Sequence, residues 1–200
     1  MAPKAQRQTQ IKDAAAKLFK NSGYAGASMK DIANSLGMEA PSLYNHFKSK
    51  EDIVIDICFD MADKFISAIE EVNDIYFNAE EKLRMAVKNH VEILTADIEG
   101  SFVFLREWRH LPTNELSRFK ELRKKYEDGF RQILIDGENE NLFKPGDRDF
   151  AVLTLLSSLN WIVEWYNPKA SGKSSPEEIA NRLTDFILSG LKKELPHSLK

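Results

Sequence analysis

The chain of 200 residues is poor in the residues that form disulfides, metal clusters and tight β-turns. Its one cysteine, Cys58, excludes an intramolecular disulfide and argues against a thiolate metal site. Nine glycines and seven prolines are few for a turn-rich β protein. The longest nearly uncharged run, residues 150–163, is shorter and more polar than the roughly 20 apolar residues of a membrane span. We therefore expect an all-α, cytoplasmic protein without a membrane span or a secretory signal.

The net charge of −3 is unevenly distributed along the chain. Residues 1–50 carry eight lysines or arginines and only three acidic side chains, whereas the remaining residues are acidic on balance. A basic N-terminal part on an acidic body is typical of a polyanion-binding module joined to a second domain. Chance clustering on a solvated face is the alternative.

Apolar residues recur at helical spacing nearly throughout the sequence. The pattern predicts N-terminal helices at about 9–21, 28–36 and 40–47, with Ser28 and Asp31 as a capping box and Gly37 as a stop. A long helix is expected from Ser49 to about Val72. In the C-terminal part, helices are expected at about 79–95, 101–109, 114–135, 147–166 and 175–195, with a turn at 137–139.

The first fifty residues contain two short helices joined by a glycine turn, Leu36-Gly37-Met38-Glu39, behind an amphipathic helix. Such short helices need tertiary packing, and the apolar residues present are enough for one three-helix core. The arrangement predicts a helix-turn-helix, whose second helix enters the major groove of DNA. We expect a DNA-binding domain at 1–50, joined by the long helix to a second helical domain at 51–200.

The ordered series Ser28-Met29-Lys30-Asp31-Ile32-Ala33, Leu36-Gly37-Met38 and Ser42-Leu43-Tyr44-Asn45-His46-Phe47-Lys48-Ser49-Lys50-Glu51 resembles the DNA-binding domain of the tetracycline-repressor (TetR) family. The resemblance covers about residues 9–55, and the chain length is also similar to that family. It implies a ligand-responsive transcriptional regulator, most often a repressor, that binds palindromic operator DNA as a homodimer. It also implies that the helical domain at 51–200 serves dimerisation and binds an effector, which releases the regulator from the operator.

Several polar side chains lie on or near the predicted recognition helix. Some can reach base edges, whereas lysines and a tyrosine can contact phosphates and so position the helix. The expected DNA-binding residues are Ser28, Lys30, Ala40, Pro41, Ser42, Tyr44, Asn45, His46, Lys48 and Lys50. For Tyr44 and His46, packing between helices is an alternative role.

The C-terminal body contains an unusual number of aromatic side chains, which together with a few polar groups are typical of small-molecule pockets. The predicted ligand-binding residues are Phe102, Arg106, Trp108, Tyr126, Phe130, Trp161 and Trp165. Core packing is the alternative for each aromatic residue. The segment from Trp165 to Ile179 resembles a pattern in family members linked to acyl-CoA or lipid metabolism, which implies an acyl-CoA or lipid-like effector.

The last two predicted helices each carry a broad apolar face, and the resemblance implies that they form the dimer interface. These faces are Ala151, Leu155, Leu156, Leu159, Ile162 and Val163, and Ile179, Leu183, Phe186, Ile187 and Leu191. The alternative is that both faces serve only the core of one chain.

A helical lipid-binding protein or an enzyme without operator-DNA function is the competing hypothesis. His90 and His110 have acidic neighbours in the sequence, but their spacing matches no zinc motif, and no glycine-rich phosphate loop occurs. Cys58 lies inside a predicted helix without an evident base. We therefore expect no catalytic site, metal or cofactor, and the expected partners are double-stranded DNA, a small molecule and a second copy of the chain.

Overall fold

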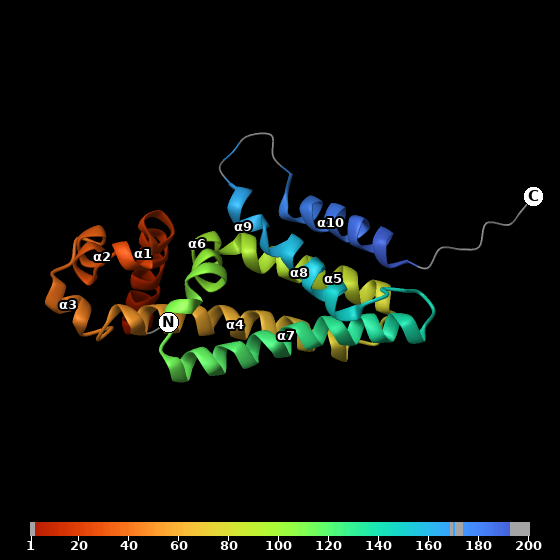
Figure 1. Ribbon diagram of the computed structural model, residues 1–200. Helices are drawn as coiled ribbons and strands as arrows, with labels where there is room; N and C mark the ends of the chain where they lie inside the picture. Colours follow the sequence, from red (N-terminus) through yellow and green to blue (C-terminus); the bar gives the residue numbers. More distant parts are fainter. Residues whose placement is uncertain (1–2, 169, 171–173, 193–200) are drawn as a thin grey trace, which may run out of the picture. The chain divides into compact units, whose positions relative to one another are not determined.

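The computed structural model describes residues 3–168, 170 and 174–192 (Figure 1). Within these residues the chain forms helices and no strand, which confirms the predicted all-α class. The elements are α1 (Pro3–Gly26), α2 (Met29–Ser35), α3 (Ala40–Tyr44), α4 (Lys50–Asp74), α5 (Ala79–Ala96), α6 (Ile98–Phe102), the π-helical turn η1 (Val103–Glu107), the 3₁₀ turn η2 (Trp108–His110), α7 (Thr113–Asn139), α8 (Arg148–Asn160), α9 (Ile162–Trp165) and α10 (Pro176–Leu191).

The chain divides into two compact units. Unit 1 consists of the residues up to Lys64 together with Asp97–Arg123, and unit 2 consists of Phe65–Ala96 together with the residues from Lys124 onward. Helices α4 and α7 each begin in unit 1 and end in unit 2. The expected boundary between residues 50 and 51 stays a prediction.

The core of unit 1 joins the three N-terminal helices to the first half of α4 and to the α6–α7 region. Helix α1 presents Ile11, Ala15 and Phe19 at helical spacing, and all three are fully or almost fully buried. They pack in one cluster with buried residues of the other elements, namely Ile32, Ala33, Leu43, Phe47, Ile53, Val54, Ile57, Cys58, Val103, Leu111 and Phe119.

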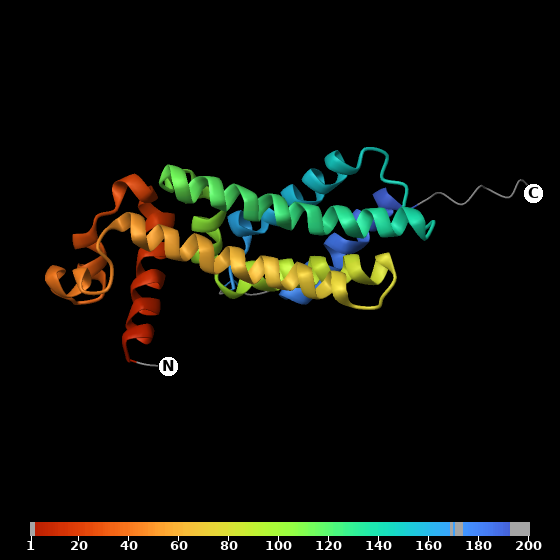
Figure 2. The same ribbon diagram turned by 90° about the horizontal axis from the view of Figure 1, so that it is seen from below.

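In unit 2, α10 packs along α5, and α8 and α9 also contact α5. The second halves of α4 and α7 lie side by side (Figure 2). The Asn73 side chain bridges them by donating to its own helix, at the Ile69 carbonyl, and across to the Gly129 carbonyl. A Cβ atom on Gly129 would stand 2.4 Å from Ile69 Cγ1, so this glycine permits the close approach of the two helices.

The helix starts marked by capping signals are confirmed, but several boundaries differ from the prediction. Helix α1 begins at Pro3 rather than at about residue 9. The predicted turn at 137–139 is wrong, because α7 continues to Asn139. Gly137 is instead a packing position, where an added Cβ would stand 2.0 Å from Phe143 Cδ2.

Two predicted helices are interrupted in the structure. The expected helix at 101–109 becomes α6 followed by the π-helical and 3₁₀ turns. The backbone hydrogen bonds of this segment therefore change from the α-helical pattern to the wider π pattern and then to the tighter 3₁₀ pattern. The expected helix at 147–166 divides at Trp161 into α8 and α9. Helix α10 is described to Leu191, and the predicted end at 195 lies outside the described residues.

Candidate nucleic-acid interface and aromatic clusters

The turn between α2 and α3 has the geometry of a glycine-dependent helix stop. Gly37 has φ 61°, a conformation that side chains with a Cβ rarely adopt. The N–H groups of Leu36 and Met38 donate to the Ala33 carbonyl, and that of Gly37 donates to the Asn34 carbonyl. These bonds satisfy the last carbonyls of α2 and fix where α3 begins.

Helix α3 is anchored from one side and open on the other. Leu43 is fully buried and Phe47, just after the helix, is 4% exposed, so both fix the segment to the core. Pro41, Ser42 and Asn45 are exposed, and Tyr44 is 51% exposed. Pro41 occupies the first turn, where its missing N–H costs no hydrogen bond. Ala40 and His46 are half-buried, and His46 Nδ1 is enclosed without a hydrogen-bond partner among the described residues.

The segment after α3 is held by hydrogen bonds at the start of α4. Ser49 Oγ accepts from the Asp52 N–H at 3.1 Å, and the Lys48 N–H donates to Asp52 Oδ2 at 3.1 Å. The Lys48 side chain is exposed, in keeping with the predicted phosphate contact.

Lys50 differs from Lys48 because its ammonium group is bonded inside unit 1. Lys50 Nζ donates to the Tyr24 carbonyl at 2.7 Å and to the Ala27 carbonyl at 2.9 Å. It also lies 4.1 Å from the centre of the Tyr24 ring, a cation–π distance. Lys50 therefore ties the end of α1 to the start of α4, and a phosphate contact by its third N–H stays a prediction.

Ser28 and Lys30 lie at the start of α2. The Asp31 N–H donates to Ser28 Oγ, and the Ser28 N–H donates to Asp31 Oδ2, which confirms the predicted capping box. The Ser28 hydroxyl also donates to Asp31 Oδ2, and this bond together with that from the Ser28 N–H lowers the pKa of the Asp31 carboxyl. The Lys30 side chain is exposed. The early start of α1 adds exposed Lys4 and Arg7, which the prediction of a helix from residue 9 had missed.

Three of the predicted ligand-binding residues, Phe102, Arg106 and Trp108, belong to unit 1. Trp108 stacks on Phe119 with ring centres 5.9 Å apart, and Phe119 also meets the edges of Phe59 and Phe104. The guanidinium groups of Arg109 and Arg123 each lie 4.9 Å from the centre of the Trp108 ring. Phe102 is half-buried, and Arg106 is exposed.

The other four, Tyr126, Phe130, Trp161 and Trp165, belong to unit 2, where the structure brings Tyr126 and Phe130 together with ring centres 5.3 Å apart. Phe65 and His90 complete this cluster, and the Tyr126 hydroxyl is hydrogen-bonded to His90 Nδ1 at 2.9 Å. Burial raises the pKa of Tyr126 and lowers that of His90 to about 3, so both side chains are neutral near pH 7. Local sequence patterns did not place His90 in the ligand set, because its partner Tyr126 is 36 residues away.

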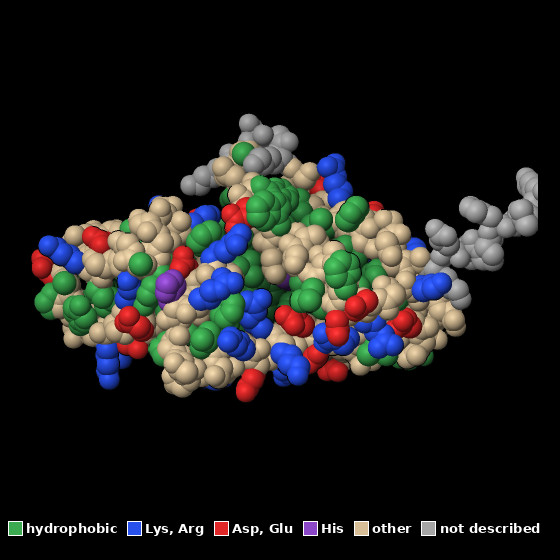
Figure 3. All heavy atoms as spheres, viewed as in Figure 1, with side chains coloured by type: hydrophobic (Ala, Val, Ile, Leu, Met, Phe, Trp, Pro, Cys, Tyr) green, Lys and Arg blue, Asp and Glu red, His purple; other side chains and the backbone are tan. Residues whose placement is uncertain are grey.

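Trp161 and Trp165 are 59% and 42% exposed. Hydrophobic side chains are visible among polar ones where α9 and α10 lie (Figure 3). Phe150, Leu153 and Phe186 are also more than half exposed. Between α8 and α10 lies an apolar groove of about 410 Å³, lined in part by Phe150, Leu155, Phe186 and Leu191.

The two apolar faces expected at the dimer interface are divided between core and surface. Leu155, Leu156, Leu159, Ile162, Val163, Ile179 and Leu191 are buried within the chain, so most of both faces serves its own core. Ala151, Leu183 and Ile187 are half-buried, and Phe186 is 73% exposed. The part that is free to contact a second chain is therefore narrower than the sequence pattern indicates.

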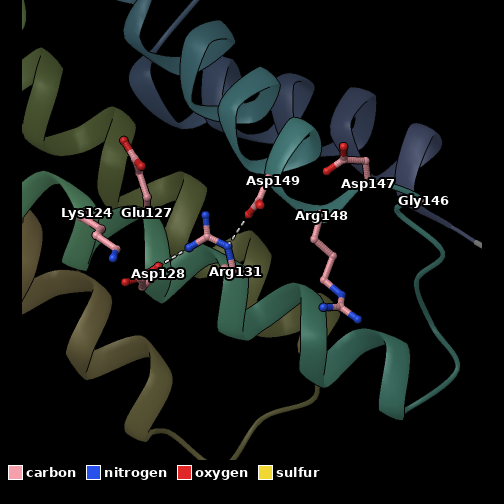
Figure 4. A pocket seen from close by; sticks show the side chains of 8 residues that line it. All are labelled: Lys124, Glu127, Asp128, Arg131, Gly146, Asp147, Arg148 and Asp149. Atoms are coloured by element: carbon pink, nitrogen blue, oxygen red, sulfur yellow. Dashed lines mark hydrogen bonds and ion pairs between the residues drawn. The ribbon is translucent and has the colours of Figure 1, made fainter.

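A second cleft of unit 2, of about 820 Å³, is lined mainly by charged side chains from α7 and from the segment that opens α8 (Figure 4). Arg131 lies between Asp128 and Asp149, and it bonds Asp149 through Nε at 2.7 Å. Arg148 pairs with Glu138. Both arginines are thus paired with acidic side chains, and the pairs Arg131–Asp149 and Arg148–Glu138 link α7 to the start of α8.

Within the described part of the chain, no three His, Cys, Asp or Glu side chains gather as metal ligands would. Burial raises the pKa of the Cys58 thiol to about 12, which disfavours the reactive thiolate. None of the described helices is long and apolar enough to cross a membrane.

Comparison with known proteins identifies both parts of the chain. Residues 11–57 match the domain described as bacterial regulatory proteins, tetR family, and residues 77–191 match the tetracyclin repressor-like C-terminal domain. The chain is 26% identical to the HTH-type transcriptional repressor KstR2 of Rhodococcus jostii, over 98% of this chain and 95% of the relative.

Solved structures agree with this assignment. The TetR family regulator PfmR of Thermus thermophilus is 30% identical, with a TM-score of 0.81 over 92% of this chain and 99% of PfmR. AibR, solved in complex with isovaleryl coenzyme A and operator DNA, is 26% identical, with a TM-score of 0.78 over 90% of this chain and 97% of AibR. The helix-turn-helix geometry and the two domain matches lead to one conclusion: the chain is a transcriptional regulator that belongs to the TetR family.

Proposed function

We propose that this regulator represses transcription by binding palindromic operator DNA as a homodimer, and that an acyl-CoA effector releases it. Residues 1–50 form the DNA-binding domain, and residues 51–200 serve effector binding and dimerisation. The DNA contacts are made by Ser28, Lys30, Ala40, Pro41, Ser42, Tyr44, Asn45, His46, Lys48 and Lys50.

The proposal is carried by the way in which α3 is held at the surface, with its apolar side buried and its polar side exposed. Its buried Leu43, with Phe47 behind it, fixes the helix to the core, while Ser42, Tyr44 and Asn45 stay exposed on a short rigid segment. Asn and Ser side chains can bond base edges in the major groove, and a tyrosine hydroxyl or a lysine can bond phosphates. An exposed polar face of this kind has no role in the chain's own core.

Dimerisation follows from the exposed aromatic residues of unit 2. Phe150, Trp161 and Phe186 are each more than half exposed, and the apolar groove lies between α8 and α10. A two-fold axis through this face would bury the same residues of both chains, as a closed dimer requires. Two recognition helices placed about 34–36 Å apart then reach successive major grooves of a palindromic site.

The effector belongs to the acyl-CoA class in this proposal. AibR, which binds isovaleryl coenzyme A and operator DNA, shares the fold over most of the chain. The ligand contacts are Phe102, Arg106, Trp108, Tyr126, Phe130, Trp161 and Trp165. An effector that prefers one conformation of the body shifts the operator affinity, by about 5- to 150-fold for a typical coupling free energy.

The proposal assigns no catalytic step to the chain. The buried Cys58 thiol and the neutral, enclosed His90 give no activated nucleophile or base that faces solvent. A repressor acts where the chromosome lies, so the proposed location is the cytoplasm.

Selection of bound DNA from a random pool tests the proposal. We expect a palindromic site with two half-sites, and binding to it with a log–log salt slope near −5, as for about six phosphate contacts. Asn45→Ala should weaken binding by about 1–3 kcal/mol and relax the base preference at one position of each half-site. Ser22→Ala, on the exposed surface of α1, is the matched control. Recovery of no symmetric sequence would contradict operator recognition.

A further inference from the structure

The pair formed by His90 and Tyr126 is a polar element enclosed in an aromatic cluster of unit 2. His90 on α5 is 2% exposed, and its Nδ1 lies 2.9 Å from the hydroxyl oxygen of Tyr126 on α7. The Phe65 ring lies 5.0 Å from the His90 ring and 5.3 Å from the Tyr126 ring, and Phe130 covers Tyr126 at 5.3 Å.

A count of hydrogen atoms shows that this pair always has one donor to spare. A neutral histidine carries one N–H and a tyrosine carries one O–H, and the bond between them uses only one of these two donors. If Tyr126 donates to Nδ1, the N–H sits on Nε2; if Nδ1 donates, the Tyr126 O–H is left over. Nε2 is buried and has no hydrogen-bond partner among the described residues. An enclosed donor without an acceptor costs free energy, and a bound ligand can remove that cost.

The spare donor is uncharged. Burial lowers the pKa of His90 to about 3, while the Asn160 side chain on α8, near enough to interact with the imidazole although outside ordinary hydrogen-bond geometry, acts to raise it. If the Asn160 oxygen accepted the spare hydrogen, its own amide group would present two further N–H donors in the same place. The cluster of Phe65, His90, Tyr126, Phe130 and Asn160 contains no formal charge, so it offers no counter-ion to an anionic ligand group.

We propose that His90, Tyr126 and Asn160 donate a hydrogen bond to an uncharged carbonyl oxygen of the effector, held against the Phe65 and Phe130 rings. For the acyl-CoA class this carbonyl is that of the thioester, and the apolar surroundings take the acyl chain beside it. The inference rests on the proposed function, because it assigns the group of the effector that this cluster recognises. It makes His90 a specificity-determining residue, which the sequence alone had not indicated.

The test compares acyl-CoA thioesters with S-alkyl-CoA thioethers, which have the same chain but lack the carbonyl oxygen. Isovaleryl-CoA and straight-chain probes from butyryl-CoA to palmitoyl-CoA, each with its thioether, are titrated calorimetrically into the full-length protein without DNA. We expect at least one thioester to bind the wild type about tenfold more tightly than its thioether, the ratio that one hydrogen bond of ordinary strength gives.

Two variants and a control make the comparison specific. His90→Leu removes both ring nitrogens with their N–H, and the double variant His90→Leu/Tyr126→Phe removes the phenol O–H as well, so that neither partner keeps a spare donor. Both should reduce the thioester preference to less than about threefold, with urea unfolding used to check that each variant is folded. Tyr76→Phe removes a hydroxyl from a fully exposed side chain and should leave the preference unchanged.

The results separate the inference from the function on which it rests. The inference is overturned if both variants keep the wild-type preference, or if no thioester binds a wild type that does bind its operator. The failure of operator selection would instead count against the proposed function, since the thioester comparison is made without DNA.

Discussion

At the scale of single residues, two lysines that are close in sequence have different surroundings. Lys48 is exposed, whereas Lys50 is half-buried and bonded to the carbonyls of Tyr24 and Ala27. These carbonyls lie at and just beyond the end of α1, where the helix leaves acceptors unsatisfied. Lys50 is therefore first a stabilising residue of unit 1, and Lys48 is the better candidate for a purely electrostatic DNA contact.

This difference leads to a paired prediction. Lys50→Met should lower the free energy of unfolding by about 1–3 kcal/mol, because it removes two hydrogen bonds from a charged donor. Lys48→Met should change that free energy by less than about 0.5 kcal/mol, but should reduce the steepness of the salt slope by about 2 for a dimer. Urea unfolding and operator titrations at several salt concentrations measure both effects. Equal stability of the two variants would argue against the internal role of Lys50.

Sequence reasoning located α3 but could not assign surroundings to its side chains. Leu43 was recognisable as the apolar residue that anchors α3. Because Leu43 is buried, its neighbour Tyr44 points to another side of the helix and is exposed. The partners of Lys50 are 23 and 26 residues away, and Tyr126 is 36 residues from His90. Such pairs form only after packing, so local patterns could not indicate them.

At the scale of elements, the two capping boxes are the clearest link between sequence and structure. Ser28 with Asp31 opens α2, and Ser175 with Glu178 opens α10, each with reciprocal side-chain and backbone hydrogen bonds. Both helices are thereby supplied with partners for N–H groups that the helix itself cannot satisfy.

We predict that Ser28→Ala and Ser175→Ala each lower the free energy of unfolding by about 1 kcal/mol, as the loss of a cap does. Ser22→Ala serves as the control and should have no measurable effect. The Ser28→Ala deficit should shrink as the pH falls below the ordinary Asp pKa of 3.8. The lowered pKa of Asp31 means that its folded-state stabilisation is present above that pH and is lost as the carboxylate takes up a proton. A deficit that stays constant in acid would exclude this linkage.

Two boundaries in the C-terminal half of the chain, at Gly137 and at Trp161, were predicted poorly. The division at Trp161 occurs without proline or glycine, and the backbone there stays in the helical region while its hydrogen bonding changes. Gly137 is the first residue of the predicted turn at 137–139, but it lies inside α7, where its lack of a side chain admits the Phe143 ring. At Gly137 the packing of Phe143, a residue outside α7, therefore outweighs the local turn signal.

At the scale of the whole molecule, the exposed aromatic residues of α8 to α10 determine the expected assembly. Phe186→Glu should weaken dimer association by about 100-fold or more, because burial of one phenylalanine side chain contributes about 1.5–3 kcal/mol and the change occurs twice. Sedimentation over a range of concentrations measures the association, and operator affinity should fall in parallel. Tyr76→Glu, which alters an exposed aromatic residue outside these helices, is the control. If Phe186→Glu remains a dimer at all concentrations, another surface forms the interface.

The chain passes between its two units three times, after Lys64, after Ala96 and after Arg123. One cut in the gene can therefore not release an intact unit 1. A fragment ending at Lys64 would lack Val103, Leu111 and Phe119, which complete its core, and would expose the apolar side chains that they cover. A hybrid regulator that joins unit 1 of this chain to the effector-binding domain of another protein will therefore need residues 97–123 as well as the first 64 residues.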